Sequence, residues 1–454
     1  MKVEFFSFLI AIVMLVGVSC QKRTADQTTL ANPDVMHTSV RKLTDVMVHD
    51  IFSPPVASRV YAYSTIAAYE ALLPGYPNYQ SLAGQLKNLK DIPKPTPGQE
   101  YCYPLASLRA FLTVGRTLTF SGDKIDEFEP LVYQKYKDAG LDEEVYDRSM
   151  AYGEAIGKKI LEWANQDGYR EIRGHRYTVV TTEPGKWQPT PPAYMDAIEP
   201  YWYKIRPFAL DSCSQFKPAV PSKFDVSKGS DFYKETMQVY DAGKNLTTEQ
   251  KTIASFWDCN PFVMHNTGHV MYATKKISPG GHWINIAAVA SKKANADFMK
   301  SVETYALVSI AVADGFISCW DEKYRSGRIR PETVINTYID KDWVPLLQTP
   351  PFPEYPSGHS VISTAAAVTL TSLFGENFAY TDSTEVVFGL LPRKFTSFHQ
   401  AAEEASISRL YGGIHYMPAI TNGQTEGRLV GELVVSKIKT RKADTKAEQV
   451  AVAK

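Results

Sequence analysis

The chain has 454 residues, 44% of them hydrophobic, so it is long enough to bury one large helical core or two of ordinary size. Lysine plus arginine and aspartate plus glutamate both number 49, which gives a formal net charge of zero. A neutral chain has no overall field to hold a nucleic acid, so any anion binding must be local. We therefore expect no nucleic-acid partner.

The N-terminus is typical of a bacterial export signal. An apolar run, FFSFLIAIVMLVGV, follows Met-Lys-Val-Glu and ends before Ser19-Cys20; it is too short for a spanning helix. The sequence GVSC resembles a lipoprotein cleavage site, which implies that a signal peptide of residues 1–19 is removed and that Cys20 is acylated. A plain secretory signal with an incidental cysteine is the alternative. We expect a protein of the bacterial cell envelope, facing the periplasm or in the outer membrane, with a lipid anchor as its only membrane attachment.

Four further cysteines remain once Cys20 is set aside, at positions 102, 213, 259 and 319. An even number in an exported chain permits disulfides. Their separations match no zinc pattern, and Cys319 falls on the apolar face of a predicted helix. We predict one disulfide or none rather than two.

Residues 20–35 are polar and aperiodic and predict a tether to a globular body. From there the dominant period is helical. The run PPVASRVYAYSTIAAYEALLPG begins with prolines, keeps its apolar residues close to one stripe and ends at Pro74-Gly75, which predicts a core helix. Residues 107–120, 124–140 and 149–168 repeat the amphipathic pattern.

Between residues 174 and 228 the chain becomes rich in proline and aromatic residues, which predicts an ordered crossing segment without long helices. The helical pattern returns at Gly229 and persists to about residue 440. We predict an all-α fold with helical bundles in two lobes: an N-terminal lobe of residues 36–228 that includes the crossing segment, a C-terminal catalytic bundle of residues 229–440, and a tail of residues 441–454.

The first candidate site motif is WDEKYRSGRIRPETV, residues 320–334. It follows a long apolar helical run and places Lys323, Arg325, Arg328 and Arg330 in one short segment. Gly327 permits a sharp loop, and cations on both sides of such a loop can converge on an anion. An ordinary solvated basic face is the alternative.

The second motif is PPFPEYPSGHSVIS, in which prolines lead into Ser357-Gly358-His359 and a helix begins there. A helix N-terminus offers free backbone N–H groups and the positive end of a dipole, so Ser357 Oγ and the Gly358 N–H are well placed for an oxyanion. The alternative is that Ser357 is only the N-cap and His359 a satisfied first-turn histidine.

The third motif is TSFHQAAEEASISRLYGGIHYMP. Ser397 and Gln400 form a capping box, and the helix is expected to run to Tyr411 and break at two glycines. Arg409 and His415 then lie on either side of a helix end and can face one point. A histidine in an ordinary loop is the alternative for His415.

Taken in order, these three motifs resemble the signature of the vanadium-dependent haloperoxidase and type 2 phosphatidic acid phosphatase superfamily. The resemblance covers residues 256–416, and looser similarity to haloperoxidase-like bacterial lipoproteins extends into the N-terminal half. It implies the haloperoxidase and acid-phosphatase-like helical fold.

The resemblance also assigns roles. Lys323, Arg330 and Arg409 would hold the oxygens of vanadate or phosphate, assisted by Ser357 and Gly358. His415 would be the axial ligand to vanadium or, in a phosphatase, the nucleophile, and His359 the acid and base. Arg325 and Arg328, which the motif leaves free, would be solvated or paired.

Two positions extend or depart from the family pattern. Trp320 and Phe352 match aromatic residues beside the vanadate in fungal chloroperoxidases, although ordinary core packing would explain them too. Ala419 stands where the family usually has an aspartate that orients the second histidine. Either another carboxylate takes that role, or His415 is less basic than usual.

Three more histidines follow the crossing segment. His265 and His269 have helical i, i+4 spacing, but no carboxylate nearby completes a metal site. We expect these residues, and His282 in particular, to line the mouth of the anion pocket.

The favoured function is a vanadate-dependent haloperoxidase that oxidises halide with hydrogen peroxide. The alternatives are an acid phosphatase that forms a phosphohistidine on a phosphate ester and needs no cofactor, and an inactive oxyanion-binding lipoprotein, favoured only by Ala419. All partners in these hypotheses are small molecules.

Overall fold

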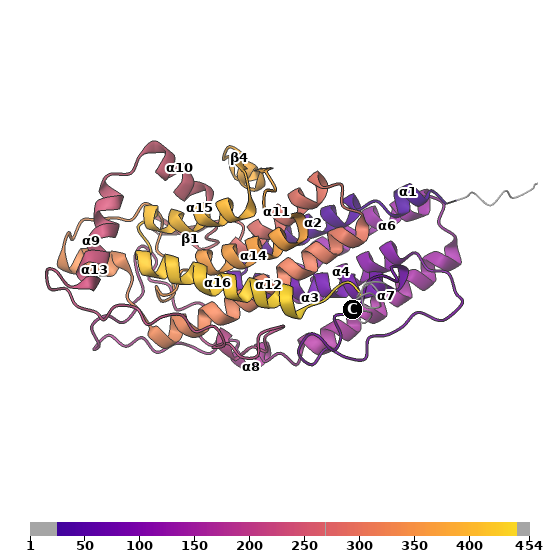
Figure 1. The fold of residues 1–454 in the computed structure, drawn as a ribbon, viewed down its shortest axis with the longest axis horizontal. Coiled ribbons are helices and arrows are strands. Elements are labelled where there is room, and N and C mark those ends of the chain that lie inside the picture. The colour runs from indigo at the N-terminus through magenta and orange to yellow at the C-terminus, as the bar shows by residue number, and fades with distance from the viewer. Residues whose placement is uncertain (1–24, 268, 443–454) are drawn as a thin grey trace, which may run out of the picture.

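A computed structural model describes residues 25–267 and 269–442. The predicted signal peptide, Cys20 and the tail beyond residue 442 lie outside this range. The described chain is mostly helical, which confirms the all-α prediction (Figure 1). Its elements are α1 (Gln27–Leu30), α2 (Asp34–His49), α3 (Pro54–Leu72), η1 (Leu73–Gly75), α4 (Tyr103–Leu118), α5 (Asp123–Asp126), α6 (Glu129–Asp138), α7 (Glu143–Ala164), α8 (Tyr169–Ile172), η2 (Trp202–Lys204), α9 (Asp231–Lys244), α10 (Thr248–Phe256), β1 (Val263–Thr267), β2 (Val270–Thr274), α11 (Pro279–Lys293), α12 (Phe298–Ser326), α13 (Pro331–Tyr338), α14 (Gly358–Phe374), β3 (Tyr380–Asp382), η3 (Thr384–Phe388), β4 (Arg393–Phe395), α15 (Phe398–Tyr411) and α16 (Met417–Lys437).

Helix α12 is the central element of the fold. The Asp297 side chain caps its N-terminus, and Gly327 ends it in the left-handed conformation at φ 58°. It packs against α3 on one side and against α14 and α16 on another, and runs through the middle of the molecule in Figure 1. Among the described residues it alone is long and apolar enough to cross a membrane, but its apolar stretch is entirely buried, as in the core helix of a globular protein.

Helix α3 is buried on all sides, whereas its sequence predicted a single apolar stripe. Every residue from Pro54 to Leu72 is buried, because α3 lies between α4 and α7 of the N-terminal half and α11 and α12 of the C-terminal half. Its many small residues permit close packing on all sides. One hydrophobic core therefore runs across both predicted lobes, and the division at residue 228 remains a prediction.

The run 124–140 forms two helices, α5 and α6, instead of one. Pro130 lies in the first turn of α6, where its missing N–H costs no hydrogen bond; in the interior of one continuous helix it would break the backbone ladder.

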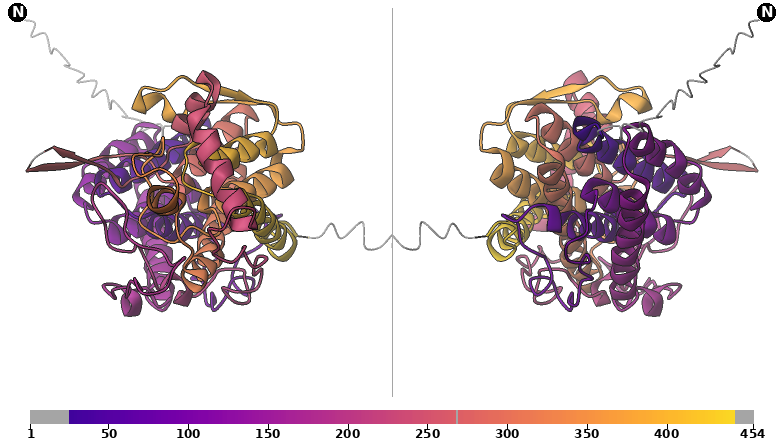
Figure 2. Two further views of the ribbon diagram at one scale, coloured as in Figure 1. Left: turned by 90° about the vertical axis from the view of Figure 1, so that its left-hand side faces the viewer. Right: turned by 90° about the vertical axis from the view of Figure 1, so that its right-hand side faces the viewer.

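The predicted helical spacing of His265 and His269 is also wrong. Strands β1 and β2 form an antiparallel hairpin in which His265 is paired with Tyr272, and the hairpin stands out from the helical body (Figure 2). The His265 ring stacks on Tyr272, with centroids 4.9 Å apart. Alternating β-branched and aromatic residues outweigh helical propensity here.

The crossing segment, residues 174–228, contains only the short η2 helix. Its backbone is joined to the loops that carry the first two motifs: Trp187 N donates to Gly327 O at 2.8 Å, and Ile198 N donates to Pro351 O at 3.0 Å. The indole of Trp320 donates to Ile198 O at 3.2 Å. These bonds hold the motif loops from outside.

Candidate active site

The three motifs meet at one cavity. They arrive from the C-terminal end of α12, the proline-rich loop before α14, and the end of α15 with the loop after it. Of the predicted site residues, the following line the cavity: Trp320, Phe352, Gly358, His359, Arg409 and His415. Lys323, Arg330 and Ser357 are completely buried and lie against the lining residues.

Lys323 lies on the last turns of α12 beneath the proline-rich loop. Its Nζ donates to the carbonyl oxygens of Pro353 and Glu354, both at 3.1 Å, and to that of Pro356, and lies 5.1 Å from the centre of the Phe352 ring. Burial lowers the pKa of Lys323 to about 8. Among the described residues, no carboxylate forms an ion pair with this ammonium group.

Arg330 is the N-cap of α13, where Pro331 begins the helix. Its Nε donates to Phe352 O and one terminal nitrogen donates to Ile414 O, both at 2.9 Å. The other terminal nitrogen is buried without a partner in the described structure. Burial lowers the pKa of Arg330 to about 10. The guanidinium therefore has a free donor that a ligand can use.

Arg409 lies in the last turn of α15. Its Nε donates to Ser408 Oγ at 2.9 Å, and a terminal nitrogen donates to Trp257 O at 2.7 Å. Burial lowers the pKa of Arg409 as well. It too has no carboxylate within ion-pair distance in the described part of the chain, so three buried cations lie around the cavity without an anionic partner of their own.

Ser357 is the N-cap of α14, and its Oγ accepts from Ser360 N at 3.3 Å. This capping bond is the structural role that the sequence offered as the alternative to oxyanion binding. The bond is long, and a hydroxyl that accepts one bond retains its own hydrogen for donation. The first turn of α14 also directs free backbone N–H groups and the positive end of its dipole toward the site.

The two histidines are both held neutral. Burial, followed by the charge of nearby arginines, lowers the pKa of His359 and of His415 well below 6.5. His359 Nε2 is buried without a hydrogen-bond partner among the described groups, while His415 Nε2 lies 3.2 Å from an Arg330 nitrogen. A neutral imidazole can accept a proton or coordinate a metal, which suits both predicted roles.

Glu354 supplies the carboxylate that Ala419 lacks. Its Oε1 lies 2.9 Å from His415 Nδ1 and accepts from Tyr416 N at 3.1 Å. The carboxylate is fully buried, which raises its pKa. A carboxylate on Nδ1 fixes the orientation and tautomer of the ring and leaves the lone pair on Nε2, the nitrogen that faces Arg330. Of the two explanations for Ala419, the structure therefore favours replacement by another carboxylate, and Ala419 itself accepts from Ser357 N at 3.0 Å.

Sequence reasoning did not identify Glu354, although a signal was present. It is the one acidic residue in the proline-rich run PPFPEYPSGH, three positions before Ser357. A charged residue in a segment that is otherwise proline and aromatic is expected to be buried only if it has a partner.

The aromatic residues form one side of the cavity. The rings of Trp320 and Phe352 lie 5.0 Å apart at 51° to each other. Arg330 lies over the Phe352 ring at 5.1 Å from its centre. Aromatic faces in contact with buried cations attract them electrostatically and exclude water.

The remaining cations of the first motif are paired, as expected. Arg325 lies at the surface, where it forms ion pairs with Asp321, at 2.9 Å, and with Glu322. Arg328 is buried and pairs with Glu235 at 2.5 Å. The four described cysteines are all free.

His282 does not line the cavity, whereas the sequence analysis placed it at the pocket mouth. It is completely buried behind Cys259, which does line the cavity, and its Nε2 lies 2.7 Å from Asp382 Oδ2. Burial alone would lower the pKa of His282, but the Asp382 carboxylate raises it well above 6.5.

Comparisons with known proteins give one consistent result. Residues 303–443 match the family described as VCPO second helical-bundle domain. The structure of a bacterial vanadium-dependent iodoperoxidase is 48% identical, with a TM-score of 0.86 over 91% of this chain and 98% of that one. A comparison with curated proteins gave no match.

Two structures of bacterial vanadium-dependent chloroperoxidase share the fold at lower identity. The holo form is 16% identical, with a TM-score of 0.64 over 92% of this chain and 96% of that one. The apo form is 17% identical, with a TM-score of 0.65 over 85% of this chain and 95% of that one. The 48% identity over nearly the full length of both chains, together with the three motifs at one cavity, shows that this chain belongs to the vanadium-dependent haloperoxidase superfamily.

Proposed function

We propose that this protein binds vanadate in the cavity and uses hydrogen peroxide to oxidise halide, with iodide as its preferred substrate. The observation that carries the proposal is the charge of the site. Three buried cations without carboxylate partners and two neutral imidazoles surround one cavity, and an oxyanion is the ligand that satisfies such a set.

The residues fit vanadate in number and kind. Lys323, Arg330 and Arg409 would hold its oxygens together with Ser357 and Gly358, and the free Arg330 nitrogen marks one donor that needs an acceptor. His415 would hold the vanadium through Nε2, because Glu354 occupies Nδ1. Bound vanadate would supply the Lewis acid that activates hydrogen peroxide toward halide.

The protein groups have separate tasks in this reaction. The three cations stabilise the negative charge of the oxyanion and of the approaching peroxide. His359, neutral and with Nε2 free of a protein partner, takes a proton from hydrogen peroxide as it binds and returns it to the leaving oxygen. Trp320 and Phe352 exclude water from the side on which halide would approach.

Two observations support iodide as the substrate. The solved structure at 48% identity is described as an iodoperoxidase. Iodide is also the most weakly hydrated and most easily oxidised of chloride, bromide and iodide, so transfer onto the aromatic side of the cavity costs it the least hydration energy. Trp320 and Phe352 match aromatic positions of fungal chloroperoxidases, so chloride and bromide belong in the same test.

The test is a set of assays on the purified mature chain, stripped of metal and then incubated with or without orthovanadate. We expect peroxide-dependent oxidation of iodide only after vanadate addition, with lower rates for bromide and chloride. Hydrolysis of an aryl phosphate at acidic pH is measured in parallel. Phosphate-ester cleavage without any halide oxidation would instead establish the phosphatase, and inactivity in both assays together with measured vanadate binding would establish the oxyanion-binding protein.

We also propose that the mature protein is a lipoprotein anchored through Cys20. The support is the apolar run that ends in Ser19-Cys20, followed by a polar stretch. Globomycin treatment and a Cys20→Ala variant should each leave unprocessed precursor in the cell. Normal processing in both cases would reject the lipid anchor.

A further inference from the structure

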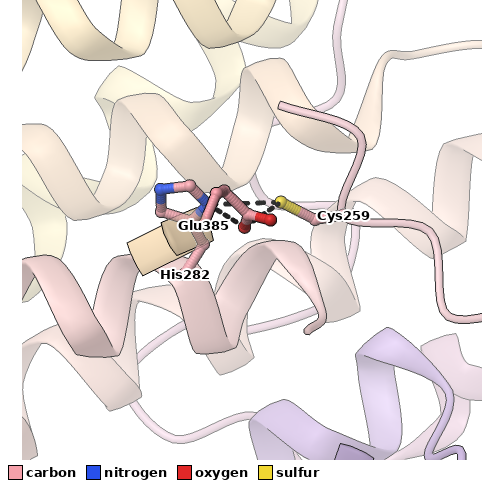
Figure 3. A group of neighbouring side chains, drawn as sticks. All are labelled: Cys259, His282 and Glu385. Carbon is pink, nitrogen blue, oxygen red and sulfur yellow. Dashed lines mark hydrogen bonds and ion pairs between the residues drawn. The ribbon is translucent and has the colours of Figure 1, made fainter. Parts of the chain in front are cut away.

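A second group of ligand-type side chains lies beside the cavity. Cys259 Sγ, His282 Nδ1 and a Glu385 oxygen lie within 4.8 Å of one another, and all three residues are buried. Figure 3 shows the three side chains directed toward a common point. They come from the loop after α10, from the first turn of α11 and from η3, so only the folded chain brings them together.

The distances form a triangle of the size that a tetrahedral metal requires. Sγ to Nδ1 is 3.3 Å, Nδ1 to Glu385 Oε1 is 3.0 Å, and Sγ to Oε1 is 3.9 Å. Zinc bonds of about 2.0–2.3 Å at tetrahedral angles place neighbouring ligand atoms about 3.4–3.6 Å apart. Shifts of a few tenths of an ångström would bring all three atoms onto one ion.

The opposite side of the imidazole is held in the manner typical of metal-binding histidines. Asp382 Oδ2 lies 2.7 Å from His282 Nε2, and the ring stacks on Trp257 with centroids 4.6 Å apart. A carboxylate on the distal nitrogen fixes the ring and strengthens the other nitrogen as a ligand. Nδ1 is thereby presented to both Cys259 and Glu385.

Without a metal, the three groups hydrogen-bond to one another: His282 Nδ1 can donate to Glu385 Oε1 at 3.0 Å, and the Cys259 thiol can donate to the same oxygen at 3.9 Å. One cation at the centre of the triangle would be bound by all three atoms at once.

We propose that Cys259, His282 and Glu385 bind a divalent transition metal of the zinc class, separate from the vanadate site. A thiolate, an imidazole and one carboxylate favour zinc over magnesium or calcium, which prefer oxygen ligands. Because Cys259 also lines the cavity, an ion can reach the site from there, and water from the cavity can complete its coordination.

The metal would brace the loop that supports Arg409. Trp257 O, two residues before Cys259, accepts from an Arg409 nitrogen at 2.7 Å. Joining this loop to α11 and η3 would fix that carbonyl. The site therefore has a structural consequence for the neighbouring cavity, but its metal binding does not depend on which reaction the cavity performs.

The test uses the reduced, metal-free full mature chain titrated with Co²⁺, which occupies zinc sites and absorbs light when bound to a thiolate. We expect one Co²⁺ per chain with a thiolate-to-cobalt charge-transfer band, and loss of that band when Zn²⁺ is added. The Cys259→Ala variant should lose the band, while the control Cys213→Ala should retain it.

Two further variants keep the test decisive if Cys259→Ala folds poorly. Asp382→Asn should keep the band but weaken Zn²⁺ affinity about 10–100-fold. Glu385→Gln should weaken it at least as much. The proposal is overturned if wild type shows no stoichiometric thiolate-bound cobalt, if Cys259→Ala shows the same band, or if Glu385→Gln binds Zn²⁺ with unchanged affinity.

Discussion

The cavity and the Cys259 group are neighbours with opposite charge. In the cavity, Lys323, Arg330 and Arg409 are buried with no carboxylate paired to any of them in the described structure. Behind its wall, one imidazole, that of His282, whose pKa is raised well above 6.5, contacts the two carboxylates of Asp382 and Glu385, so negative charge is in excess there. Burying charge costs free energy unless an opposite charge compensates it, so each region indicates a ligand of the opposite sign. The contrast supports both proposals, an anion site in the cavity and a cation site in the neighbouring group.

The largest expected effect comes from removing the proposed axial ligand. His415→Ala should lower vanadate-dependent iodide oxidation by about 10³-fold or more, because the site loses a direct ligand to the reacting group. Steady-state rates at saturating vanadate measure this. The control is His265→Ala, which removes an exposed histidine from the β1–β2 hairpin. Equal activity in the two variants would remove His415 from the site.

Removing one buried cation should weaken anion binding next most strongly. Lys323→Met should raise the vanadate Kd about 10²-fold, because a buried charged donor is lost. The matched control is Arg325→Met, two residues further on, where the cation is paired at the surface with Asp321 and Glu322. Equilibrium dialysis with vanadium analysis gives both values. Similar losses in the two variants would show that general charge, not convergence, binds the anion.

Glu354 is not one of the proposed vanadate ligands; its carboxylate bonds His415 and lies near Arg328, so its removal should have a smaller effect. Glu354→Gln should weaken vanadate binding about 10–100-fold. The pH profile of iodide oxidation should also shift, because the imidazole loses the carboxylate on its Nδ1. Glu70→Gln alters another buried carboxylate, which accepts from Ser81 and from Leu82 N, and serves as control. An unchanged pH profile in Glu354→Gln would assign Glu354 a purely structural role.

The neutral histidines predict how stability depends on pH. Each buried histidine has a folded pKa well below 6.5, so below that pH it binds fewer protons in the folded chain than in the unfolded chain. The folded state therefore keeps its full stability above about pH 6.5 and loses stability as the pH falls. Between pH 6.5 and pH 5, each histidine should lower the free energy of unfolding by about 2 kcal/mol. Chemical denaturation of the anion-free protein measures this loss.

The His359→Gln variant separates this contribution from the rest of the protein. The free energy of unfolding of this variant should fall by about 2 kcal/mol less than that of wild type over the same pH interval. A wild type that is equally stable at pH 5 and 7 would show that the two histidines are charged in the fold.

The smallest effect is expected at the aromatic side of the cavity. Phe352→His should change the ratio of bromide to iodide oxidation a few-fold while vanadate binding is kept, because a polar ring admits water beside the site. Halide assays at fixed vanadate measure the ratio. An unchanged ratio would show that Trp320 and Phe352 serve only in ordinary core packing.

The helices and the three motifs were predictable from sequence because their signals are local. Periodicity marks α3 and α12, and Ser357-Gly358-His359 lies where prolines end and a helix begins. Two contacts were not predictable, because they join residues far apart in the sequence. Glu354 and His415 are 61 positions apart, and His282 and Asp382 are 100 positions apart. The β1–β2 hairpin was missed because a short histidine spacing fits a helix and a strand pair equally well.

The most direct test of the central claim is one titration that follows bound vanadium and activity together. Orthovanadate is added to the metal-free chain, and bound vanadium and the rate of peroxide-dependent iodide oxidation are measured at each step. We predict that the rate rises in proportion to bound vanadium and that both saturate at one vanadate per chain. A chain that binds no vanadate, or an oxidation rate that does not follow the bound vanadium, would contradict the account.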